Sequence, residues 1–135
     1  MPSLFLSLYA SWALLILRIA LGMIFIAHGW PKIKNLQQTA TNFHGMGFRP
    51  GKFWGTIAAV LEFFGGIALI VGLFTMLLGG LFVVEFAIIL GWKLRKNIPL
   101  VNGWELDLII FAGATIILAL GAGAYSFDRL LYLWL

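Results

Sequence analysis

Three ionisable residues interrupt long apolar stretches of this sequence, and their types are suited to chemistry. Arg18 lies within the apolar run of residues 12–30, and Glu62 and Glu85 lie within two further apolar runs. A charged side chain in such a run is costly in lipid, and it commonly faces a partner or marks a pathway for protons, ions or substrates. We expect Arg18 to form an ion pair with one glutamate, which leaves the second glutamate either protonated or hydrated by a polar cavity.

Two carboxylates and a histidine lie near the ends of the apolar runs. Glu105 and Asp107 begin the last run, two residues apart, so only one of them can face the centre of a helix bundle directly. His28, near the end of the first run, belongs to the residue type that titrates near neutral pH, and it could carry protons or bind a quinone carbonyl. A purely interfacial histidine, and buried charges that only fix helix packing, are the structural alternatives.

The composition places these residues in a membrane protein. Of the 135 residues, 62% are hydrophobic and 10% are charged, whereas soluble domains have about 45–50% and about 25%. Four apolar runs are long enough to cross a bilayer, at about residues 12–30, 54–73, 76–92 and 104–120. The sequence therefore predicts an all-α fold, one membrane-embedded four-helix bundle over residues 1–135. The first run is too long for the apolar region of a signal peptide, so we expect it to be retained.

Breaks in the apolar pattern define the expected ends of the helices. The first helix is expected to end at Gly29-Trp30-Pro31, because proline disfavours a helical residue before it. Residues 31–53 are polar, but three apolar residues at helical spacing predict a short amphipathic helix in the membrane interface: Leu36, Ala40 and Phe43. Small residues on the predicted helix faces are expected to allow close helix packing: Gly22, Gly29, Gly65 and Gly66. In the last helix, Asn102 and Glu105 have the spacing of a capping box.

The basic residues predict how the chain is oriented. Seven of them fall in the loops 31–53 and 93–103, whereas Arg129 alone falls on the opposite side. The positive-inside rule then makes both loops cytoplasmic and both termini external, in a prokaryotic plasma membrane. The net charge of +4 follows from this loop bias, and we do not interpret it as a nucleic-acid-binding surface.

The sequence also limits the cofactors that the chain can hold by itself. It contains no cysteine, which excludes thiolate-bound iron–sulfur clusters and covalent c-type haem. The two histidines, His28 and His44, lie in settings too different for a bis-histidine haem, and no zinc-binding spacing occurs. We therefore expect no metal site and no intrinsic cofactor.

Several short motifs, in order along nearly the whole chain, together resemble the DoxX family of small prokaryotic membrane proteins. They are Arg18-Ile-Ala-Leu-Gly22, His28-Gly29-Trp30-Pro31-Lys32, Glu62-Phe-Phe-Gly65-Gly66, Gly72-Leu-Phe-Thr75, Glu105, and Gly121-Ala-Gly-Ala-Tyr-Ser126-Phe-Asp128. The resemblance implies a four-helix integral membrane protein whose functional or core-polar residues are Arg18, His28, Glu62 and Glu105. Glu85 joins this set on physical grounds alone. The family takes its name from a subunit of a thiosulfate:quinone oxidoreductase, so the resemblance also implies a quinone-linked redox role.

Three functions fit these observations. The first is a membrane subunit of a quinone-linked redox system, which binds a small lipid-soluble ligand at the Arg/Glu cluster and receives electrons from a soluble redox partner. The second is a non-catalytic scaffold or assembly factor whose buried charges are structural. The third is a small proton-coupled carrier, which would have to work as a homo-oligomer because four helices are few for alternating access. All three act in the lipid bilayer, and only the first would involve the chain in an enzyme.

Overall fold

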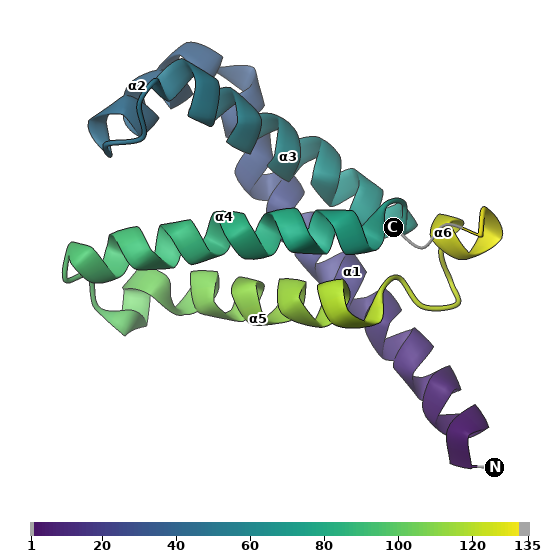
Figure 1. The fold of residues 1–135 in the computed structure, drawn as a ribbon. Helices are drawn as coiled ribbons and strands as arrows, with labels where there is room; N and C mark the ends of the chain where they lie inside the picture. Colours follow the sequence, from purple (N-terminus) through teal and green to yellow (C-terminus); the bar gives the residue numbers. More distant parts are fainter. Residues whose placement is uncertain (1, 133–135) are drawn as a thin grey trace. The chain divides into compact units, whose positions relative to one another are not determined.

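The computed structural model describes residues 2–132, and Figure 1 shows that they form a succession of helices. Four of the helices are long and apolar enough to cross a membrane, and the described residues include no β-strand. The predicted all-α membrane fold with four spans is thereby confirmed. Three of the candidate spans lie in α1 (Pro2–Lys34), α3 (Gly51–Val71) and α4 (Thr75–Arg95), and the fourth, Leu100–Leu120, comprises residues 100–104 and α5 (Glu105–Leu120). The shorter elements are α2 (Leu36–Gly45), an irregular turn η1 (Leu100–Trp104) and α6 (Phe127–Leu130).

The chain divides into two compact units. The middle unit comprises residues 19–70, and the terminal unit comprises the described residues up to 18 and from 71 onwards. Helix α1 contributes to both units, since the division falls between Arg18 and Ile19.

Helix α1 extends beyond the predicted span of residues 12–30 at both ends. Its first turn contains Pro2, which is tolerated there because that backbone position needs no donor. The prediction that the helix ends at Gly29-Trp30-Pro31 is wrong, because α1 continues through Pro31 to Lys34. Proline removes one backbone donor, but membrane helices tolerate this when other groups satisfy the freed carbonyl. The chain turns at Asn35, whose side chain accepts a hydrogen bond from the Gln38 N–H at 3.0 Å and caps α2.

Helix α2 is the short helix predicted within residues 31–53. Its one buried side chain is Thr39, whose hydroxyl donates to the carbonyl of Asn35 at 2.9 Å. Leu36, expected on the apolar face, is 43% exposed. The start of α3 lies against this helix, because a Cβ on Gly51 would collide with the carbonyl oxygen of Ala40. Helix α2 therefore packs through its Thr39 side onto the beginning of α3.

Glycines bring α1 and α3 into close contact in the middle unit. A Cβ on Gly22 would lie 2.6 Å from the carbonyl oxygen of Gly66, and a Cβ on Gly66 would lie 2.8 Å from that of Gly22. A Cβ on Gly29 would lie 2.5 Å from the backbone nitrogen of Phe63. Gly65 is buried in α3 beside them. The two backbones are therefore too close for larger residues at these crossings.

Replacement of Gly29 by alanine is expected to destabilise the protein by about 1–3 kcal/mol, because the added methyl group meets backbone atoms that cannot rotate away. Thermal unfolding in mild detergent would measure the loss. Gly91→Ala is the matched control, since no atom lies within 4 Å of its Cβ position, and alanine there favours the helix. Equal unfolding temperatures for the two variants would contradict the tight α1–α3 contact.

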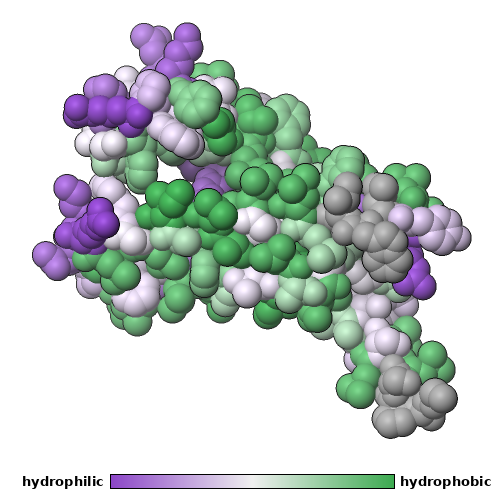
Figure 2. Space-filling model, viewed as in Figure 1, coloured by the Kyte–Doolittle hydropathy of each residue, from purple (hydrophilic) through white to green (hydrophobic). Residues whose placement is uncertain are grey.

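In the terminal unit, α4 and α5 lie side by side as an antiparallel pair (Figure 1). Gly79 permits the contact, because its Cβ would lie 2.8 Å from the backbone nitrogen of Leu118. The buried side chains between them include Phe82, Ile110 and Ile117. Apolar residues cover the visible face of the pair, and hydrophilic residues gather at the end where α4 finishes (Figure 2). An apolar outer face of this kind is suited to lipid.

Candidate functional site

The middle unit contains a buried ion pair between Lys32 and Glu62. The Nζ atom of Lys32 lies 2.5 Å from Oε2 of Glu62, whose side chain is only 2% exposed. Lys32 stands in the last turn of α1 and retains 28% exposure. Gly29, one turn earlier, brings the two helices close at this point, since its Cβ would lie 3.0 Å from the backbone carbonyl carbon of Glu62. The sequence predicts Lys32 in the polar loop 31–53, so it does not indicate Lys32 as the partner of Glu62.

His28 lies on the exposed side of α1. Its Nδ1 atom is 2.8 Å from the carbonyl oxygen of Ile24, four residues earlier in the same helix. Two residues further on, the Trp30 ring packs against Phe63 with 5.6 Å between centroids, and Lys34 Nζ lies 5.6 Å from the centroid of the same indole. This surrounding of exposed aromatic and basic groups fits the interfacial interpretation of His28.

A second ion pair lies in the terminal unit, at the far end of α4. Lys93 Nζ is 2.5 Å from Oδ2 of Asp107, and it also donates to the carbonyl of Gly103 at 3.1 Å. Asp107 is buried, whereas Glu105 is exposed, in contrast with the expected place of Glu105 in a buried cluster. The reason is the two-residue offset, which turns the two carboxylates to nearly opposite sides of α5. Like Lys32, Lys93 was expected in a loop.

The predicted capping box forms only in part. Glu105 Oε1 accepts a hydrogen bond from the Asn102 backbone N–H at 3.2 Å, which is one half of such a box. Asn102 itself has a positive φ of 58°, and Trp104 is the residue that caps α5. Glu105 thus helps to shape the turn before α5.

Arg18 is fully buried in the terminal unit. Its Nη2 atom donates to the carbonyl of Tyr125 at 2.6 Å. Its Nη1 atom and Ser126 occupy the space that a Cβ on Gly72 would need, and Gly72 also has a φ of +78°. Both the positive φ and the lack of space therefore require glycine at this turn.

Arg18 lies near the beginning of α4. Its guanidinium group is beside the turn between α3 and α4, next to Gly72, whereas the half-buried Glu85 lies about 15 Å further along α4. Glu62 has Lys32 as a cation of its own. An ion pair between Arg18 and a glutamate stays a prediction.

Asp128 holds the C-terminal loop, residues 121–130, against the start of α4. Its Oδ1 atom accepts a hydrogen bond from the Phe74 N–H at 2.7 Å, and its Oδ2 atom accepts one from the Thr75 N–H at 2.9 Å. Its own N–H donates to the carbonyl of Gly72 at 2.9 Å. The carboxylate caps α4 at the positive end of the helix dipole. It also acts electrostatically on the guanidinium group of Arg18.

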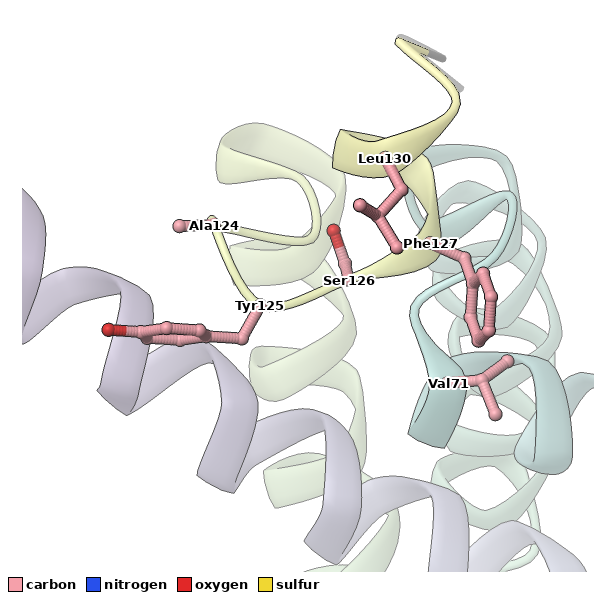
Figure 3. Close-up of a pocket in the computed structure, with 6 residues that line it drawn as sticks. All are labelled: Val71, Ala124, Tyr125, Ser126, Phe127 and Leu130. Atoms are coloured by element: carbon pink, nitrogen blue, oxygen red, sulfur yellow. The ribbon is translucent and has the colours of Figure 1, made fainter.

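Two cavities border the C-terminal loop. The first, the polar cavity, has a volume of about 300 Å³, and its polar side chains are those of Ser7, Ser11, Ser126, Asp128 and Arg129. The second, the apolar cavity of about 330 Å³, is lined by Val71 and residues 124–127 and 130. In Figure 3 the side chain of Phe127 lies beside Val71, whereas the Tyr125 ring points towards α1. That ring packs 4.8 Å from the ring of Trp12, centroid to centroid.

The described residues include no group of three or more histidine or acidic side chains placed to hold a metal ion. Two ion pairs among these residues connect different helices, Lys32 of α1 with Glu62 of α3 and Lys93 of α4 with Asp107 of α5. Such pairs can hold a fold together, and a buried carboxylate among them can also exchange a proton.

Residues 13–94 of the chain match the DoxX family model. Two Escherichia coli K12 proteins are similar over most of the chain. Inner membrane protein YqjF is 34% identical, and the match covers 87% of this chain and 90% of the relative. Inner membrane protein YphA is 32% identical, and the match covers 86% of this chain and 88% of the relative. A Bacillus subtilis 168 protein named "Putative oxidoreductase CatD" is 30% identical and covers 71% of this chain and 69% of its own length. No solved structure matches the chain.

Proposed function

The chain belongs to the DoxX family and is a multi-pass integral membrane protein, and we propose that it serves as the membrane subunit of a redox system in a bacterial inner membrane. The names of two relatives support the location, and the name of the Bacillus relative supports the redox class. The ligand of this proposal is a quinone or a similar lipid-soluble molecule. Its electrons come from a soluble partner, because the chain has no cysteine to hold an iron–sulfur cluster.

The observation that carries the proposal is the buried ion pair of Lys32 and Glu62. A carboxylate that is 2% exposed on an apolar helix is costly to keep there. Intramembrane acidic groups of this kind commonly belong to proton pathways. Lys32 is 28% exposed, so the pair reaches from a buried oxygen to the surface of the unit.

The chemistry needs a proton donor beside the ligand. A quinone that takes up two electrons must also take up two protons to become a quinol. In the ion pair the proton resides on the Lys32 ammonium group. Lys32 would pass this proton to Glu62, which would deliver it to a quinone oxygen, and Lys32 would then take up a new proton from the solvent side. Two such cycles would supply both protons of the quinol. A general acid must lie within hydrogen-bond reach of the oxygen that it protonates, so we expect the ligand to bind next to α3 at Glu62.

The test is the quinone content of the protein after purification in mild detergent, measured by absorbance and mass spectrometry of an organic extract. We expect near-stoichiometric quinone in the wild type and at least a several-fold loss in Glu62→Gln. Asp107→Asn is the matched control, because it removes one partner of the other buried lysine ion pair. It should lower stability and leave the quinone content unchanged.

Two outcomes would contradict the proposal. The first is wild-type protein that contains only bulk lipid and also fails to bind an added short-chain ubiquinone, followed by quenching of tryptophan fluorescence. The second is equal quinone loss in Glu62→Gln and Asp107→Asn, which would show that the loss reports general instability.

A scaffold is the second candidate function, and a specific observation favours it. The ion pairs of Lys32 with Glu62 and of Lys93 with Asp107 each join two helices, and Asp128 joins the C-terminal loop to α4. All three arrangements therefore have a structural use that requires no ligand. This function would be supported if the wild-type protein contained no quinone and if the Glu62→Gln variant co-purified with the same partner protein as the wild type.

A further inference from the structure

The polar cavity of the terminal unit has unused hydrogen-bond donors. The Ser126 hydroxyl donates to Gly123 and accepts from the Arg129 backbone, and both Asp128 oxygens accept from the start of α4. Ser7 donates its hydroxyl hydrogen to the Leu4 carbonyl. Ser11 accepts from the Ala124 N–H at 3.3 Å, which leaves its own hydroxyl hydrogen for another acceptor. Arg129 is an exposed residue of the cavity wall, and its guanidinium group forms no hydrogen bond or ion pair with any of the described residues.

The charge that the cavity offers to a ligand is that of Arg129. The two charged residues of its wall are Asp128 and Arg129. Both oxygens of the Asp128 carboxylate accept hydrogen bonds from the start of α4, where the helix dipole is positive. The guanidinium group of Arg129 has no comparable partner among the described residues. A donor-rich cavity with such a guanidinium group selects a ligand that offers anionic oxygen acceptors.

The surroundings of the cavity indicate that this ligand is an amphiphile. The cavity lies at the ends of two membrane spans, where α4 begins and α5 finishes, and its wall includes Met76 and Leu120. The ends of such spans lie at the depth of lipid head groups. The apolar cavity is adjacent, because Ala124 and Ser126 line both cavities. A head group in the polar cavity would therefore have an apolar surface beside it for an acyl chain.

From these observations we infer that the polar cavity is a binding site for the anionic head group of a membrane amphiphile, either the phosphate of a phospholipid or the carboxylate of a fatty acid. Arg129 would bind the oxygens as a planar fork, and Ser11 would donate one further hydrogen bond. A volume of about 300 Å³ is sufficient for such a head group. This site is separate from the proposed function, because all its residues belong to the terminal unit.

The experiment is native mass spectrometry of the full chain in a neutral detergent, titrated with phosphatidylglycerol, oleate or inorganic phosphate. We expect Arg129→Gln to weaken phosphatidylglycerol binding roughly tenfold, the effect of losing charge-assisted hydrogen bonds, and Ser11→Ala to weaken it several-fold. Arg95→Gln is the matched control, because it removes the same charge from an exposed residue in the last turn of α4. It should leave the binding unchanged.

The added ligands distinguish the sources of the anion. Binding of oleate that depends on Arg129, without such binding of phosphatidylglycerol, would assign the site to a fatty acid. Displacement of bound phosphatidylglycerol by inorganic phosphate would instead assign the site to free phosphate. It would overturn the proposal that the ligand is an amphiphile. Equal effects of Arg129→Gln and Arg95→Gln, or no effect of either, would overturn the site. Ser11→Ala keeps the charge, and thermal unfolding of all three variants shows whether each is folded.

Discussion

Substitution of Asp128 by alanine is expected to destabilise the protein by about 2–3 kcal/mol, because it leaves two backbone N–H groups at the start of α4 without their acceptors. The carboxylate is 5% exposed and accepts hydrogen bonds from two backbone N–H groups at the start of α4. Each of these capping bonds contributes about 1 kcal/mol. The Arg18 guanidinium group, which is fully buried, also loses the nearby negative charge. Thermal unfolding in mild detergent, followed by circular dichroism, would measure the loss.

Two further variants make this result specific. Asp128→Asn keeps one acceptor oxygen but no charge. Its free energy of unfolding should therefore fall between that of the wild type and that of Asp128→Ala. Glu105→Ala removes a carboxylate that is exposed, and it should cost less than about 1 kcal/mol. If Asp128→Ala were no more damaging than Glu105→Ala, the cap on α4 would not contribute to stability.

The two single substitutions that break the ion pair of Lys32 and Glu62 are expected to have unequal costs in stability. Lys32→Met leaves a carboxylate that is 2% exposed without its cation, and should cost about 3–5 kcal/mol. Glu62→Leu leaves a lysine that is 28% exposed, whose long side chain can turn towards the surface, so its cost should be smaller. The double variant, with two apolar side chains, should recover most of the lost stability.

The measurement is a double-mutant cycle on unfolding in detergent. A coupling well above about 1 kcal/mol, with Lys32→Met the worse single variant, is the expected result. Additive losses would show that the two residues do not stabilise each other. A larger loss for Glu62→Leu would show that the lysine, rather than the carboxylate, is the trapped charge.

The four spans could be predicted from the sequence, because a long apolar run has few alternatives to a membrane helix. The end of α1 could not, because Pro31 breaks a helix by local rules, whereas the helix in the structure continues to Lys34. The effect of this one error was large. With Lys32 placed in a loop, Arg18 is the single buried cation available to the two glutamates.

The candidate sites required contacts that no local pattern contains. Asp128 and the start of α4 are more than fifty residues apart, and only the fold brings them together. The spacing of Glu105 and Asp107 showed that one of them faces inward, but not which one. Asp107 does so because Lys93 on α4 is beside it. The polar cavity likewise combines two serines of α1 with the C-terminal loop, which lies far along the chain.

The cap on α4 also sets an order of events during biosynthesis. Phe74 leaves the ribosome 54 residues before Asp128, whose carboxylate completes the first turn of α4. While α4 and α5 enter the membrane, the donors at the start of α4 must therefore rely on water. The terminal unit becomes complete only when synthesis has passed Asp128, so a nascent chain that stops earlier would carry an uncapped helix into the bilayer.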